Sequence, residues 1–158
     1  MRISGGRLTS WLFQGTYRGD NLPLHLAAIR RLEPRKEEVY EHEYLYSCLS
    51  VLDAKAQVLL GYDALLMAAA SIVLSVVPDG TSTGKALIVA ALATSGVSSV
   101  LCLPVVWVQW TDTDEFERAE DSFKRLLAVR NRRTICYRLA WVIAHLAAVL
   151  LIVGTPLQ

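Results

Sequence analysis

The sequence predicts an all-α membrane helical bundle with three transmembrane spans and two long helices that extend into a cytoplasmic helical region. Hydrophobic residues make up 53% of its 158 residues, which is high for a soluble domain of this length. They are concentrated in three tracts, at about residues 57–77, 86–108 and 136–153. About 20 apolar residues are enough to cross the hydrocarbon core of a bilayer. The last tract is short, and Ile135 lengthens it.

Long stretches without helix-breaking residues predict that the first and third spans continue as helices outside the membrane. The chain has no proline between Pro34 and Pro78, and neither proline nor glycine between Trp110 and Gly154. Since proline ends or kinks a helix, we expect one helix at about 36–77 and another at about 113–153. Their cytoplasmic parts are expected at about 36–56 and 113–135, and the first would extend roughly 30 Å at 1.5 Å per residue.

The chain divides into an N-terminal segment, 1–35, and a membrane domain, 36–158. A short helix is expected after Asn21, with Pro23 in its first turn and Pro34 at its end. This helix is either packed on its own bundle or lies on the membrane surface. A polar turn at 78–85 joins the first two spans. The second span carries small residues four apart, such as Ala91, Ser95 and Ser99, a pattern that allows helix backbones to approach closely in lipid.

The basic residues predict the orientation. Seven lie in the segment 109–138, whereas the turn at 78–85 holds only Lys85. Basic residues are concentrated in cytoplasmic loops. We therefore expect the N-terminus and the segment 109–138 in the cytoplasm, and the C-terminus on the opposite side.

Composition also excludes several functions. The net charge is +1, so there is no global basic field for nucleic acid. The three histidines and three cysteines are scattered, and we predict no metal site, no cofactor and no disulfide framework. Without a nucleophile beside a base, catalytic residues are not expected, and an enzyme is the least favoured class.

Two ionisable residues lie inside the predicted spans, Asp63 in the first and His145 in the third. Intramembrane ionisable residues are costly and usually have a function or a partner. Both spans begin at the cytoplasmic side, so the two groups reach similar depth, and one hypothesis is that they pair. The alternative is that Asp63 faces water in a subunit interface and His145 bonds a backbone or serine oxygen.

Charged residues near the membrane boundary are candidates for ligand binding or gating: Asp53, Lys55, Arg130, Arg132 and Arg133. Asp53 and Lys55 do not face each other on a helix, so each needs another partner, for example in the basic segment near Arg130. The alternative is that both are solvated. The three arginines suit lipid or nucleotide phosphates, or they serve only to set the topology.

The residues at the start of the first span resemble a known family. Asp53-Ala54-Lys55-Ala56, followed by Leu59-Leu60-Gly61 and Asp63-Ala64, is similar to the opening motif of the Pycsar transmembrane effector family of bacterial anti-phage defence. The layout of helices over about 45–154 resembles that family as well. Two positions depart from its pattern: Gln57 stands where a small polar residue is usual, and Asp63 stands where asparagine is usual.

The resemblance implies a cell-killing effector in the bacterial inner membrane. A cyclase makes a cyclic mononucleotide on infection, and the effector then assembles and impairs membrane integrity, with membrane lipids and further copies of itself as partners. Three spans in one chain cannot enclose a water-filled pore, so activity requires a homo-oligomer. Two alternatives remain: a two-span effector of cyclic-oligonucleotide defence, and a structural or regulatory membrane subunit without enzymatic activity.

Overall fold

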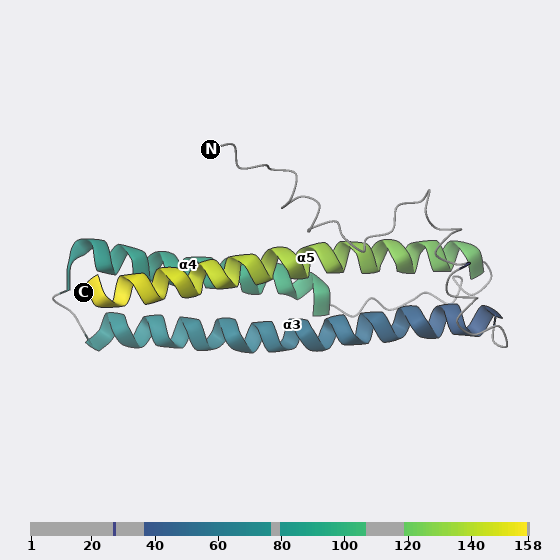
Figure 1. Cartoon of the computed structure of the whole chain (residues 1–158), viewed down its shortest axis with the longest axis horizontal. Helices are drawn as coiled ribbons and strands as arrows, with labels where there is room; N and C mark the ends of the chain where they lie inside the picture. Colours follow the sequence, from purple (N-terminus) through teal and green to yellow (C-terminus); the bar gives the residue numbers. More distant parts are fainter. Residues whose placement is uncertain (1–26, 28–36, 77–79, 107–118, 158) are drawn as a thin grey trace, which may run out of the picture. The chain divides into compact units, whose positions relative to one another are not determined.

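The computed structural model describes residues 27, 37–76, 80–106 and 119–157. From residue 37 onward, side chains are described at 43, 45–76, 80–106 and 125–157. Apart from residue 27, the predicted N-terminal segment lies outside the described residues. Throughout the described part the regular structure is helical, and strands are absent there (Figure 1). The elements are α3 (Glu37–Val76), α4 (Ser82–Val106), α5 (Ala119–Gly154) and the short 3₁₀ helix η3 (Thr155–Leu157).

All three long helices meet the requirements for crossing a membrane. Leu45–Val76, Ser82–Val106 and Arg125–Leu157 are each long and apolar enough to span. The helix expected at 36–77 is observed at Glu37–Val76. The helix expected at 113–153 is observed from Ala119 to Gly154, and its first predicted residues lie outside the described part. The all-helical prediction with three span-length helices is therefore confirmed.

The chain separates into two compact units, and each is described by itself. The first unit contains residues 1–53 and 108–135, so its described helices are the beginning of α3 and the beginning of α5. Leu45 and Leu49 of α3 and Leu127 of α5 are buried. Because the first two are four residues apart, they lie on one face of the helix. This unit therefore has a small apolar interior of its own.

The second unit contains residues 54–107 and 136–158, which include the rest of α3, all of α4 and the rest of α5. Its core takes residues from each helix: Leu59, Cys102, Ala140 and Ala144 are buried together, and Leu60, Leu101 and Tyr137 pack against them. The Ser98 hydroxyl donates to the Ala140 carbonyl at 2.9 Å. Small side chains at these contacts bring the helices close, as expected for packing in lipid.

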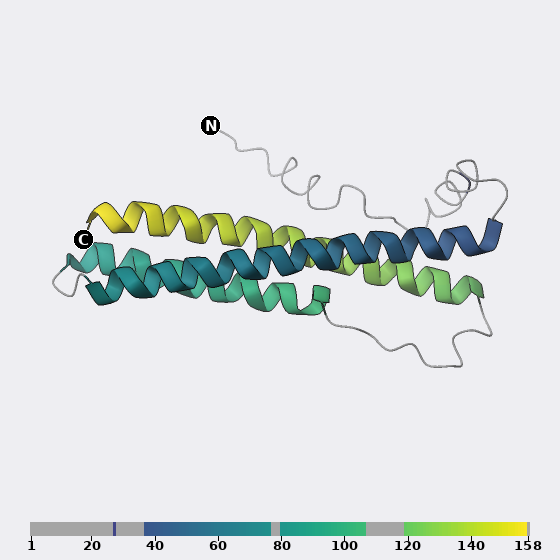
Figure 2. The ribbon, with the colours of Figure 1, turned by 90° about the horizontal axis from the view of Figure 1, so that it is seen from below.

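The beginning of α4 lies against the chain's C-terminal end, as both views show (Figures 1 and 2). A side chain on Gly154 would meet Ile88 Cγ1 and Leu87 Cβ at 3.0 Å, a tight contact that would require these neighbours to move by a few tenths of an ångström. Thr81 caps α4, because its hydroxyl accepts from the Gly84 amide at 3.1 Å and donates to the Leu157 carbonyl. Thr81, which precedes α4, and η3 are thus held together by packing and hydrogen bonding.

Candidate functional site

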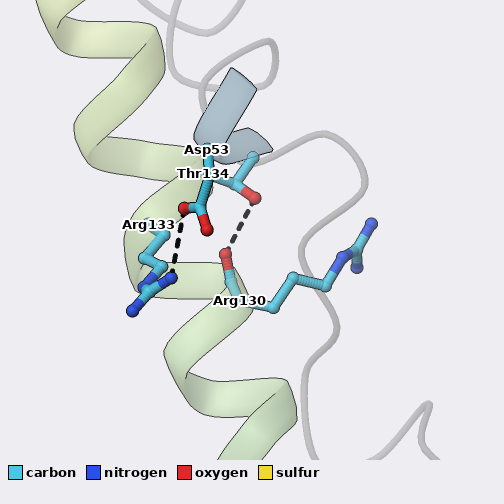
Figure 3. A network of polar contacts seen from close by, with 4 residues as sticks. All are labelled: Asp53, Arg130, Arg133 and Thr134. Carbon is cyan, nitrogen blue, oxygen red and sulfur yellow. Dashed lines mark hydrogen bonds and ion pairs between the residues drawn. The ribbon is translucent and has the colours of Figure 1, made fainter. Parts of the chain in front are cut away.

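In the first unit, an ion pair links α3 to α5 (Figure 3). Arg133 Nη1 donates to Asp53 Oδ1 at 3.3 Å. The Arg133 side chain is 11% exposed and that of Asp53 is 35% exposed, so the arginine is held inside while the carboxylate reaches the surface. Of the two alternatives for Asp53, a partner in the basic segment or solvation, the first is observed, and the partner is Arg133.

The other predicted boundary residues do not join this pair. Arg130 extends away from Asp53, and its carbonyl accepts a hydrogen bond from Thr134 Oγ1 at 2.8 Å (Figure 3). Lys55 and Arg132 are exposed, and Arg130 is half-buried. Helical geometry explains part of the split, because Arg132 and Arg133 are adjacent and their side chains point in different directions. Of the five predicted residues, Asp53 and Arg133 are therefore the two brought into contact.

In the second unit, Asp63 is fully buried between α3 and α4. Ser95 Oγ lies 3.3 Å from Asp63 Oδ1 and also 3.3 Å from the Asp63 backbone carbonyl oxygen. Ser99 Oγ donates to Oδ2 at 3.4 Å. A hydroxyl carries one proton, so Ser95 divides its donation between two acceptors. The carboxyl group is thus satisfied by hydroxyl groups of the neighbouring apolar helix.

These contacts decide between the hypotheses for the two intramembrane residues. In the described part of the chain Asp63 and His145 do not pair. The alternative that Asp63 faces water is wrong for this chain, because its side chain has no exposed surface. His145 Nδ1 lies 2.8 Å from the Trp141 carbonyl oxygen, which confirms that it bonds a backbone oxygen.

His145 also belongs to a cluster of rings on α3 and α5. Its ring centroid is 3.9 Å from that of Trp141 and 6.1 Å from that of Tyr62. All three side chains are exposed. Trp141 lies three residues beyond Arg138, and aromatic rings with polar groups are favoured near the membrane–water boundary. His145 therefore lies in an exposed aromatic cluster with Trp141 and Tyr62.

Sequence reasoning missed Ser95 and Ser99 as partners of Asp63. Both were noticed as small residues that permit close packing, while their hydroxyl groups were not assigned. Their spacing could have revealed this role. Serines four residues apart lie on one helix face, and these two lie in the span that follows the span containing Asp63. Small size and hydrogen bonding act together here, since close backbones bring short side chains within reach.

The described residues contain no group of three or more His, Cys, Asp or Glu side chains that could hold a metal ion. Cys48, Cys102 and Cys136 are free thiols. The observed groups form polar contacts between helices, and such contacts can be exchanged for others. These contacts are an arginine–carboxylate pair in one unit and a carboxyl–hydroxyl cluster in the other. No protein-family model, curated protein or solved structure matches this chain.

Proposed function

We propose that the chain is a membrane effector of anti-phage defence that responds to a cyclic nucleotide second messenger. In this proposal it oligomerises in the bacterial inner membrane and impairs its integrity, which leads to cell death or growth arrest. The protein acts without enzymatic activity. The N-terminus and the basic segment before the third span face the cytoplasm, in accord with the distribution of basic residues.

The observation that carries the proposal is the position of Asp53. It opens the D-x-K-A motif that resembles the effector family, and its carboxylate is bonded to Arg133 in the basic segment. Both residues lie at the charged ends of apolar tracts in helices long enough to span. An interaction at this place joins the segment that would meet a cytoplasmic messenger to the helices that would act on the membrane.

A gating role for the ion pair follows from its chemistry. A cyclic mononucleotide carries one phosphodiester charge, and the arginine guanidinium is a planar donor that suits phosphate as well as carboxylate. Asp53 Oδ1 lies 3.3 Å from Arg133 Nη1. In the proposed mechanism the ligand phosphate competes with Asp53 for Arg133, and release of α3 from α5 permits assembly. Because three spans cannot surround a pore, the active form is an oligomer.

The number of span-length helices favours this class over the two-span alternative. Among the described residues three helices meet the length and composition requirement, whereas an effector of cyclic-oligonucleotide defence with two spans requires two. The structural-subunit alternative predicts that the membrane stays intact whatever nucleotide is present. A single leakage experiment separates all three.

The experiment uses the purified full chain in liposomes filled with a self-quenched dye. The four 3′,5′-cyclic mononucleotides are added one at a time, and cyclic dinucleotides and trinucleotides form a second set. We expect leakage with at least one cyclic mononucleotide. Leakage with only the second set would support the alternative of a two-span effector of cyclic-oligonucleotide defence. No leakage at a protein density that gives oligomers would contradict the effector proposal.

Variants test the gate in the same assay. Arg133→Gln should lose the response, because the guanidinium is absent. Asp53→Asn should respond at a lower nucleotide concentration, because the amide competes less well for Arg133. Arg125→Gln is the matched control, since it removes an exposed arginine from the same helix, and it should respond like the unmodified chain. Equal behaviour of all three variants would remove the gating role.

A further inference from the structure

In the second unit, α4 turns polar side chains toward its neighbouring helices. Ser95 and Ser98 are fully buried, and Ser99 is half-buried. The large side chains that α4 exposes over the same stretch are aliphatic: Val97, Val100 and Leu103. Aliphatic side chains suit lipid, whereas polar side chains inside a membrane face the interior of a bundle or a water-filled cavity.

Asp63 of α3 joins these hydroxyl groups, and we call Asp63, Ser95, Ser98 and Ser99 the polar cluster. The carboxyl oxygens of Asp63 lie 3.3 Å from Ser95 Oγ and 3.4 Å from Ser99 Oγ. Hydrogen bonds from a hydroxyl to a carboxylate are normally about 2.5–2.7 Å long, so both contacts are loose. No basic side chain in the described part of the chain bonds to Asp63. A charge on this carboxyl group therefore has no counter-charge there.

Helix packing does not require a carboxylate at this place. The core of the same unit holds its three helices together with apolar side chains, among them Leu59, Ala140 and Ala144. Ser98 is used in packing, since its hydroxyl donates to the Ala140 carbonyl at 2.9 Å. Asp63 is costly in an apolar span, and intramembrane carboxylates commonly mark the paths of ions. The position of Asp63 thus points to contact with water in another state of the protein.

An oligomer supplies that contact. Copies inserted with the same topology are parallel, so their Asp63 side chains lie at one depth. When α3 and α4 separate, their aliphatic surfaces remain suited to lipid, and the polar cluster is the part that suits water. A carboxyl group in water is ionised at neutral pH. Rings of carboxylates are a means by which channels select cations.

We propose that the polar cluster lines the water-filled path of the active oligomer, and that Asp63 makes this path prefer monovalent cations such as K⁺ over anions. The inference rests on the proposed function, because it names the ions that cross when membrane integrity is impaired. It concerns the second unit, whereas nucleotide sensing was assigned to Asp53 and Arg133 in the first.

Ion selectivity in a planar bilayer tests the role of the charge. The full chain separates about 0.1 M from about 0.01 M KCl, because fixed charges act over about 10–30 Å at these ionic strengths. The four 3′,5′-cyclic mononucleotides are added one at a time. The reversal potential of the evoked current should correspond to a severalfold higher permeability for K⁺ than for Cl⁻.

Three variants assign that preference. Asp63→Asn should bring the ratio of K⁺ to Cl⁻ permeability close to one, whereas Asp63→Glu should keep it high because the charge is retained. Glu43→Gln is the matched control, since it removes an exposed carboxylate from the first unit. Its permeability ratio should equal that of the unmodified chain.

Cysteine labelling tests whether the polar cluster meets water. In full-length protein whose three native cysteines are replaced by alanine, Ser99→Cys reports on the cluster and Val100→Cys on the lipid-facing surface of α4. The two positions are adjacent, so they are matched in depth. A cationic methanethiosulfonate reagent should modify Ser99→Cys severalfold faster once nucleotide is added, and faster than an anionic reagent does. Val100→Cys, which is exposed beside the cluster, should react slowly throughout.

The outcomes separate this inference from the proposed function. A nucleotide-evoked current without preference for K⁺, or equal labelling at positions 99 and 100, would overturn the inference and leave the effector proposal standing. No current with any of the four nucleotides would overturn both. Should Asp63→Asn fail to fold, the labelling comparison decides alone, because both cysteine variants retain Asp63.

Discussion

Two aspartates of α3 show how the same side chain is accommodated in different surroundings. Asp53 is partly exposed and bonded to a guanidinium, whereas Asp63 is fully buried and bonded to two hydroxyl groups. The positions are about 15 Å apart along the helix at 1.5 Å per residue. At Asp53, water and an arginine together stabilise the negative charge of the carboxylate. Inside the apolar segment, short hydroxyl side chains on a closely packed helix supply the polar contacts.

The largest expected effect comes from a change of charge at the buried position. Asp63→Lys should lower the free energy of unfolding by about 2–3 kcal/mol, because a longer cationic side chain must fit into a fully buried site. Asp63→Asn should cost less than about 1 kcal/mol, because an amide still accepts from Ser95. Unfolding in detergent, followed by circular dichroism, measures both. An equally large loss for Asp63→Asn would show that the site depends on a charged partner.

A smaller effect is expected from the ion pair. A double-mutant cycle with Asp53→Asn and Arg133→Gln should give a coupling free energy of about 1 kcal/mol, since the pair is partly buried. The parallel cycle with Asp63→Ala and Ser95→Ala should give about 0.6 kcal/mol, typical of interhelical hydrogen bonds in membranes. Zero coupling in the first cycle would mean that water alone satisfies Asp53.

The two serines should differ from each other. Ser95→Ala should destabilise by about 1 kcal/mol, because this buried hydroxyl has two acceptors on Asp63, and Ser99→Ala by about 0.5 kcal/mol, because its single contact is longer and half-buried. The same unfolding assay compares them. The reverse order would place the main contact of Asp63 at Ser99.

The smallest effect is the response to salt. Raising the ionic strength from about 0.1 M to about 1 M shortens the screening length from about 10 Å to about 3 Å. The coupling between Asp53 and Arg133 should fall by a few tenths of a kcal/mol, because Asp53 reaches the surface. The coupling between Asp63 and Ser95 should not change. Equal salt sensitivity in the two cycles would contradict the difference in burial.

The extent of α3 was predictable because helix ends are governed by local residues. Pro34 and Pro78 bracket it, and the observed ends lie between them. The partner segment of Asp53 was one of two alternatives, since the charge could be compensated either by a basic residue nearby or by water. The choice of Arg133 over Arg130 depends on how α5 is rotated, which spacing alone does not determine.

The environment of Asp63 was predictable only in part. An intramembrane carboxylate requires polar contacts, but their identity depends on the register of α4 against α3. Ser95 and Ser99 were recognised as small residues, and the same residues turned out to be the donors. For His145, a backbone acceptor one turn earlier was among the alternatives, whereas its contact with the Tyr62 ring requires packing between helices.

The proposed function requires α3 to pass from water into lipid between its two aspartates, and spin labels in liposomes test this passage. With the native cysteines replaced by alanine, one label is placed at Ser50 and another at Leu65, both exposed positions. The Ser50 label should relax mainly by collision with a water-soluble nickel chelate, and the Leu65 label mainly by collision with oxygen dissolved in the bilayer. Access of the nickel chelate to both labels would contradict a membrane-embedded second half of α3.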